Sequence, residues 1–148
     1  MVKIVPLIST RCSGPLGLVH LPRVWQKMLL ASRDQLADGY RSGEGGFDGF
    51  VLDALGIDLK DAAEYISSDQ PTYLAFEGWV RAQADAGRLT PEAIASVNEQ
   101  ILGFPMPDPR RTELLQGVGL SADEDIHAGA DINDLDDWAG FHRALCGD

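Results

Sequence analysis

Signals that begin and end helices recur along this chain and divide it into short stretches. The clearest is the run Thr90-Pro91-Glu92, which places a capping hydroxyl before a proline at the first helical position and an acid near the positive end of the helix dipole. Apolar residues then recur at helical spacing until Gly103. This run therefore predicts one short amphipathic helix.

The same signals predict a mostly α-helical fold for the whole chain. A helix begins near Pro22, carries an apolar stripe to Leu36 and ends at Gly39. Further starts are marked by an acid or a hydroxyl able to cap a helix, namely Asp48, Asp58, Thr72, Asp108 and Asp134. Val2 to Ile8 has strand-like composition, but Pro6 restricts it to an edge strand or an extended arm. We therefore predict a single compact domain, residues 1–148, of about seven short helices and at most one short N-terminal strand.

The last predicted helix carries apolar residues and a histidine at helical spacing. We expect Leu135, Trp138, His142 and Leu145 to share its buried face. A lone histidine on such a face usually has a packing role, so His142 is not taken as a site residue.

Composition fits a globular protein outside the membrane. The chain has 148 residues, of which 45% are hydrophobic and 24% charged, and no apolar run approaches the ~18 residues of a membrane span. Its start lacks the apolar length of a signal peptide. Cys12 and Cys146 lie near opposite ends, a spacing that fits neither a disulfide framework nor a zinc motif. We predict a cytoplasmic protein with two free thiols and no membrane partner.

Charge is distributed unevenly along the sequence. The net charge of −11 argues against nucleic-acid binding, which needs a basic surface. Met1 to Arg33 nevertheless holds five bases and no acid, whereas Ser121 to Asp148 holds eight acids and one arginine. Two interpretations follow. Either the acidic end packs near the basic start, or the basic start faces a small anionic molecule.

The loop from Ser9 to Gly14 is the candidate anion site. It is rich in hydroxyls and precedes a helix start, where free N–H groups attract negative charge. Arg11, Ser13 and Arg23 are the predicted anion-binding residues, because a guanidinium can grip a carboxylate or phosphate with two hydrogen bonds. The spacing matches no phosphate-loop or dinucleotide motif, so an ordered surface loop is the alternative.

His20 and Cys12 are the candidate catalytic residues. His20 precedes Arg23 by three residues and can serve as a general acid or base. Cys12 can act as a nucleophile if Arg11 or a helix start lowers the pKa of its thiol and His20 lies within reach. The alternatives are a packing or capping histidine and an unreactive cysteine.

Alternating acids between Ser121 and Asn133 resemble a calcium-binding loop only superficially. Ala128 stands where such a loop needs glycine, and Asp134 replaces the bidentate glutamate. No metal-binding, nucleotide-binding or serine-hydrolase motif is present elsewhere. We predict no metal and no cofactor.

Several segments resemble a known family. GPLGLVHLPRVWQK, then GY, then GGFDGFVLDALGID, then a tryptophan inside FEGWV, are similar to the uncharacterised bacterial domain-of-unknown-function family numbered 5069. The similarity spans roughly residues 15 to 103. It implies a compact helical bacterial protein and carries no function.

Two functional hypotheses remain open. In the first, the chain is a small cofactor-free enzyme that performs acid–base chemistry on a small anionic metabolite, with His20 transferring a proton while Arg11 and Arg23 hold the anion. In the second, it is a non-catalytic ligand-binding or protein-interaction module whose acidic face meets a basic partner.

Overall fold

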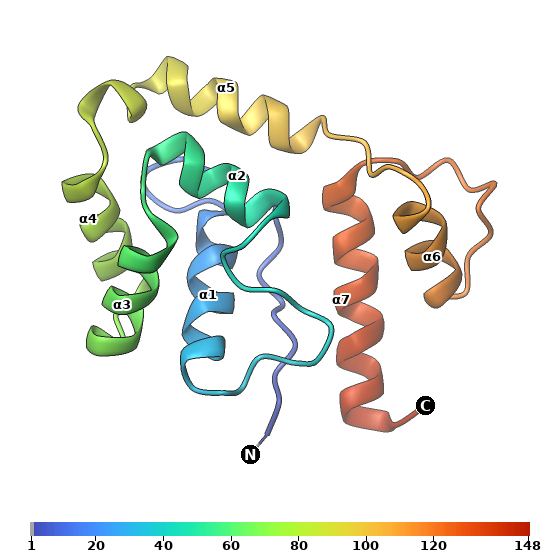
Figure 1. Ribbon diagram of the computed structural model, residues 1–148. Helices are drawn as coiled ribbons and strands as arrows, with labels where there is room; N and C mark the ends of the chain where they lie inside the picture. The colour runs from blue at the N-terminus through green and yellow to red at the C-terminus, as the bar shows by residue number, and fades with distance from the viewer. Residues whose placement is uncertain (1) are drawn as a thin grey trace.

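The computed structural model describes residues 2–148 and confirms a mostly α-helical chain (Figure 1). Within that range the helices are α1 (Leu21–Ser32), α2 (Gly46–Leu55), α3 (Leu59–Asp69), α4 (Tyr73–Gln83), the short 3-10 helix η1 (Ala86–Arg88), α5 (Pro91–Leu102), α6 (Arg110–Gly117) and α7 (Gly129–Cys146).

The main hydrophobic core lies under the first five α-helices. α1 contributes Leu21, Val24 and Met28, which pack with buried residues of α2 to α5 such as Leu52 and Phe76. In Figure 1, α5 spans the molecule from the end of α4 toward α7, and α6 lies beside α7 at the far side. The last two helices therefore form a second unit of packing, joined to the core through the end of α5.

The predicted caps at Asp58, Thr72 and Thr90 are confirmed. Each of these side chains accepts a hydrogen bond from a backbone N–H in the first turn of α3, α4 or α5. Capping depends only on nearby residues, so it can be read from the sequence.

α1 begins where the sequence predicts but ends earlier. Pro22 lies in its first turn as expected, but the helix ends at Ser32, because Asp34 adopts a positive φ of 54°. Leu36 lies beyond the helix and forms an isolated parallel bridge with Ile4. The N-terminal segment is thus an extended arm with a single bridge.

Two acids predicted as caps lie inside helices instead. α2 begins at Gly46, before Asp48, and α7 begins at Gly129, before Asp134. Asp48 is only 3% exposed, and its side chain has other partners, described below.

The predicted buried face of α7 is wrong. Trp138 and Leu145 are 60% and 73% exposed and His142 is also exposed, while Asp137 is buried. The physical reason is an ion pair between Asp137 and Arg23, which turns the acid inward and the adjacent tryptophan outward. None of the helices in residues 2–148 is long and apolar enough to cross a bilayer.

Candidate functional site

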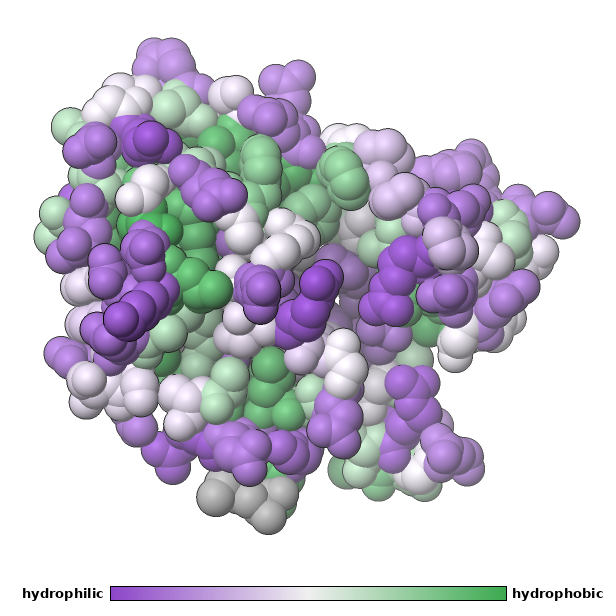
Figure 2. Space-filling model, in the orientation of Figure 1, coloured by the Kyte–Doolittle hydropathy of each residue, from purple (hydrophilic) through white to green (hydrophobic). Residues whose placement is uncertain are grey.

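A cavity of about 960 Å³ lies where α2, the chain after α5 and the start of α7 meet. Figure 2 shows the corresponding hollow between the larger part of the surface and the part formed by α6 and α7. Much of its wall is apolar, and the aromatic or apolar side chains in it are Tyr40, Phe47, Phe50, Ile101, Phe104, Pro105, Met106 and Pro107. The charged side chains in the wall are Arg23, Lys27, Arg41, Glu44, Asp48, Glu99, Arg110 and Asp136.

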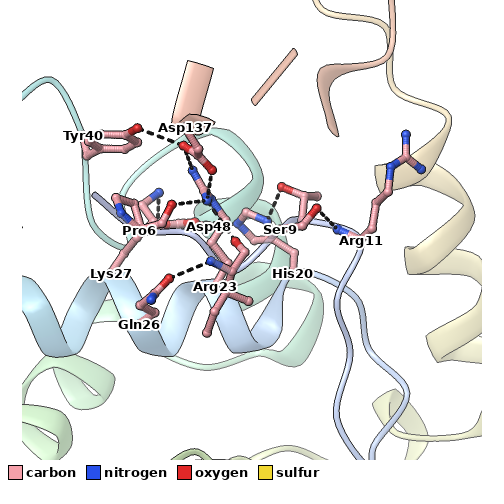
Figure 3. A network of polar contacts seen from close by, with 12 residues as sticks. Pro6, Ser9, Arg11, His20, Arg23, Gln26, Lys27, Tyr40, Asp48 and Asp137 are labelled. Atoms are coloured by element: carbon pink, nitrogen blue, oxygen red, sulfur yellow. Dashed lines mark hydrogen bonds and ion pairs between the residues drawn. The ribbon is translucent and has the colours of Figure 1, made fainter. Parts of the chain in front are cut away.

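A continuous series of polar contacts ends at this cavity (Figure 3). Thr10 Oγ1 lies 3.1 Å from His20 Nδ1, and His20 Nε2 lies 2.6 Å from Asp48 Oδ1. The other carboxylate oxygen of Asp48 lies 2.8 Å from Lys27 Nζ. Thr10, His20 and Asp48 are at most 3% exposed, whereas the Lys27 side chain is 12% exposed. We call these four residues the polar network.

Burial and neighbouring groups together set the protonation of His20 and Asp48. Burial lowers the pKa of His20, outweighing the hydrogen bond and charge of Asp48, so the imidazole is neutral. Burial alone would raise the pKa of Asp48, but the His20 hydrogen bond and the Lys27 charge hold it well below its ordinary value. An ionised Asp48 accepts the Nε2–H of His20, and His20 Nδ1 then accepts the hydroxyl proton of Thr10.

Lys27 is the most exposed member of the network at the cavity wall, which His20 and Asp48 also line. Burial lowers the pKa of its ammonium group, while the contact with Asp48 acts in the opposite direction. Its only ion-pair or hydrogen-bond partner among residues 2–148 is Asp48. An ammonium group has three N–H donors, so two remain available to a molecule in the cavity.

Gly43 helps to hold Asp48 in place. Its backbone N–H donates to Asp48 Oδ2 across 2.8 Å, and its φ of 76° is one that glycine adopts readily. A Cβ atom here would also lie 2.4 Å from Leu59 Cδ1. The glycine-rich loop from Arg41 to Gly46, which composition alone suggests is flexible, therefore has a defined structural task.

Arg23 lies one turn before Lys27 and makes four hydrogen bonds within the protein. Its guanidinium donates to both carboxylate oxygens of Asp137, at 2.6 and 3.1 Å, and to the carbonyl oxygens of Pro6 and Ile8. The Tyr40 hydroxyl also donates to Asp137 Oδ1, across 2.9 Å. Burial raises the pKa of Asp137 and of Tyr40. Arg23 thus binds an internal carboxylate and joins α1 to α7.

The other predicted anion-binding residues do not converge with Arg23. Arg11 pairs with Asp131 at the surface, and Figure 3 shows its side chain pointing away from His20. Ser13 is exposed, and neither residue lines the cavity. Two bases of the N-terminal segment, Arg11 and Arg23, therefore meet acids of the C-terminal segment, as one of the two sequence interpretations expects.

The two predicted catalytic residues are neighbours through the backbone, since the His20 N–H donates to the Cys12 carbonyl oxygen across 3.1 Å. His20 forms part of the cavity wall, but both ring nitrogens are occupied and the side chain is 2% exposed. Cys12 is exposed, and the ring nitrogens of His20 bind Thr10 and Asp48 rather than its thiol. Sequence reasoning missed Lys27, although its position one turn after Arg23 places both bases on one side of the same helix.

The acidic loop before α7 is organised by a buried arginine. Arg111 donates to the carbonyl oxygens of Ala122, Glu124 and Ile126, at 3.0, 2.6 and 2.8 Å. Within residues 2–148 no three or more histidine, cysteine or acidic side chains are grouped to hold a metal ion.

Two comparisons of the chain with known proteins found no match. No protein-family model matches it, and no curated protein matches it. The resemblance to family 5069 stays a prediction.

Proposed function

We propose that this protein is a cofactor-free enzyme that performs acid–base chemistry on a small molecule bound in the cavity. The observation that carries the proposal is the polar network, which runs through the protein interior and ends with Lys27 at the cavity wall. Buried networks that shift the pKa of a group facing a cavity are frequent at catalytic sites.

Lys27 is the proposed proton-exchanging group. Burial lowers its pKa below that of a free lysine, which is the direction that favours a lysine as general acid and base. Asp48 orients the amine, and His20 orients Asp48 through its Nε2–H. His20 is therefore a positioning residue in this proposal, because a bound molecule cannot reach its occupied nitrogens.

The proposed ligand carries one anionic group and an apolar part. Arg41 and Arg110 line the cavity without an ion pair to any of residues 2–148, and Lys27 adds free donors beside them. Besides Asp48, three acids line the cavity, namely Glu44, Glu99 and Asp136. They would repel a polyanion, so a monoanion or a zwitterion fits better. Phe47 and Phe104, in edge-to-face contact at 5.7 Å, offer a surface for the apolar part.

A non-catalytic binding protein is the second candidate. The observation that favours it is that every buried side-chain nitrogen and oxygen in the described part of the chain has a hydrogen-bond partner. For such a network, stabilising the fold around a binding cavity is a sufficient role, and no catalytic step is needed to explain it.

Proton exchange with solvent separates the two candidates. Small carboxylates and phosphates are first screened for those that raise the melting temperature, since a ligand stabilises the state it binds. Each binder is then incubated with the protein in D₂O, and loss of its carbon-bound proton signals is followed by NMR. The enzyme catalyses the exchange, Lys27→Met abolishes it, and the matched surface variant Lys60→Met does not. Binders that never exchange would leave the binding protein as the function.

We also propose that the protein resides in the cytoplasm. Cys12 and Cys146 are both exposed and unpaired with each other, which agrees with a reducing compartment such as the cytoplasm.

A further inference from the structure

The chain contains only three lysines, and their surroundings differ sharply. Lys3 pairs with Asp34 at the surface and its side chain is 42% exposed. Lys60 is exposed in the first turn of α3. Lys27 alone lines the cavity, with a side chain that is 12% exposed. A reagent that distinguishes lysines can therefore report on the cavity directly.

We propose that the Lys27 amine is a nucleophile that forms an imine with a carbonyl compound bound in the cavity. This inference rests on the proposed function, because it uses the same site, and it adds the class of substrate. The substrate class is a carbonyl compound that also carries one carboxylate or comparable anionic group and an apolar part.

The surroundings of Lys27 meet the requirements of an amine nucleophile. Such an amine must be reachable, held in place and neutral for part of the time. The cavity makes Nζ reachable, and Asp48 Oδ2 at 2.8 Å holds it in place. Burial disfavours the ammonium form, as does the charge of Arg23, while Asp48 and Asp137 favour it. The resulting pKa is lower than that of a free lysine, so the neutral amine is more populated at neutral pH.

The reaction balances without any group that the protein lacks. The ammonium form first loses a proton to solvent or to the Asp48 carboxylate. The nitrogen lone pair then forms a bond to the carbonyl carbon, and the carbonyl π electrons move to oxygen. Two protons pass from nitrogen to that oxygen, which leaves as water while the C=N bond forms. Amine and carbonyl compound thus give an imine and one water molecule.

An imine also accounts for how proton chemistry could proceed at this site with no cofactor. A protonated imine withdraws electrons from the neighbouring carbon and makes its C–H bond more acidic than that of the parent carbonyl compound. Asp48 stays beside the nitrogen and stabilises the positive charge of the protonated imine. The inference therefore links the nucleophile to the proton exchange proposed above.

Reductive trapping tests this inference with the other lysines as internal references. The probe is 4-formylbenzoate, which combines a carbonyl group, an aromatic ring and a carboxylate. The full-length protein is incubated with the probe and sodium cyanoborohydride at neutral pH, and adducts are located by peptide mass spectrometry. We expect the Lys27 adduct to exceed the Lys60 adduct, because a lowered pKa raises the neutral fraction of the Lys27 amine and the cavity holds the probe beside it. The rate of Lys27 labelling should also reach its plateau at lower pH than that of a free lysine side chain.

Matched variants define the controls. Lys27→Arg keeps a positive charge beside Asp48 and removes the primary amine, so the cavity adduct should vanish while the melting temperature is largely retained. Lys60→Arg should leave the Lys27 adduct unchanged. Benzaldehyde, which lacks the carboxylate, should label Lys27 more weakly than 4-formylbenzoate does. Labelling of Lys27 no greater than that of Lys60 would overturn the inference.

Binding measurements separate failure of the imine from failure of the site. Chemical-shift changes of cavity residues such as Phe47 and Ile101 report whether the probe binds, independently of any covalent step. Binding without a Lys27 adduct overturns the imine and leaves the cavity as a small-molecule site. If neither this probe nor any screened anion binds, both the inference and the proposed function fall.

Discussion

Arg23 and Lys27 occupy successive turns of α1, and both pair with a buried carboxylate, yet their situations are opposite. Arg23 makes four hydrogen bonds to acceptors of the protein itself, whereas Lys27 pairs with Asp48 alone among residues 2–148, although both side chains line the cavity. Burial does not explain the difference between Arg23 and Lys27, since both side chains are largely hidden from solvent. The difference lies in how many acceptors of the protein each side chain binds. A buried charge that binds several protein acceptors stabilises the fold, and one that binds a single carboxylate keeps donors for a ligand.

The largest expected loss of stability comes from breaking the ion pair between Arg23 and Asp137. Arg23→Met leaves the Asp137 carboxylate buried without a counter-charge, and we expect the free energy of unfolding to fall by about 3 to 5 kcal/mol. Urea denaturation measures this loss, with the exposed arginine variant Arg143→Met as the control. Arg23→Met combined with Asp137→Leu should recover much of it, because no uncompensated charge is then buried. A loss below about 1 kcal/mol would show that the pair is not structural.

Lys27→Met should cost less than Arg23→Met. Asp48 keeps the hydrogen bonds from His20 and from the Gly43 N–H, so its charge is still partly stabilised. We expect a loss of about 1 to 2 kcal/mol by the same urea measurement, comparable to one hydrogen bond to a charged group. Equal losses for the two variants would show that the Arg23–Asp137 and Lys27–Asp48 pairs contribute equally to stability.

The free energy of unfolding should depend on pH because of His20 in the polar network. Its pKa in the folded protein lies below the ordinary value of 6.5, so in the interval between the two the unfolded chain binds more protons. Stability therefore falls as pH drops below about 6.5, by at most about 1.4 kcal/mol per pH unit for one proton. Asp48, whose pKa is lowered, adds a further loss only below its ordinary value near 3.8.

The variant His20→Asn isolates the contribution of that histidine. Asparagine tolerates the positive φ of 71° at this position and does not titrate, so the decline between pH 7 and pH 5 should flatten. Melting temperatures across this range are the measurement, and the exposed His142→Asn is the matched control. An unchanged slope in His20→Asn would show that His20 is not the group responsible.

The smallest effect is expected at Arg11, the third base compared. Its pair with Asp131 is exposed on both sides, with side chains 44% and 49% accessible. Arg11→Ala should change the free energy of unfolding by about 0 to 1 kcal/mol, less at high salt. A loss as large as that of Arg23→Met would mean that the surface pair helps to hold α7 in place.

The parts of the structure that could be predicted from the sequence are those set by neighbours along the chain. Thr72 and Thr90 were identified as caps because a cap interacts with backbone groups three residues away. The end of α1 was misplaced because the apolar residue Leu36 continues the helical period but belongs to a bridge with Ile4. Periodicity indicates which residues are apolar and does not say which element buries them.

The site depends on contacts that no local pattern encodes. Asp48 has the sequence environment of a cap, and only the fold brings it to His20, 28 residues earlier, and to Lys27. Asp137 and Trp138 are adjacent in sequence, and the helical pattern favoured burial of the tryptophan. In the structure the ion pair with Arg23 of α1 buries Asp137 and leaves Trp138 exposed. The basic character of the N-terminal segment was visible, but which base meets an internal acid was not.

The separation of Arg23 from Asp137 also bears on how the protein is made. These residues are 114 positions apart, so a ribosome releases the arginine long before its partner exists. A nascent chain can assemble the apolar contacts of α1 to α5, but its guanidinium has no carboxylate to meet until α7 emerges. The cavity, whose wall includes both α2 and the start of α7, is completed at the same moment. A chain that stops before α7 lacks Asp137 and therefore leaves the Arg23 guanidinium without its carboxylate partner.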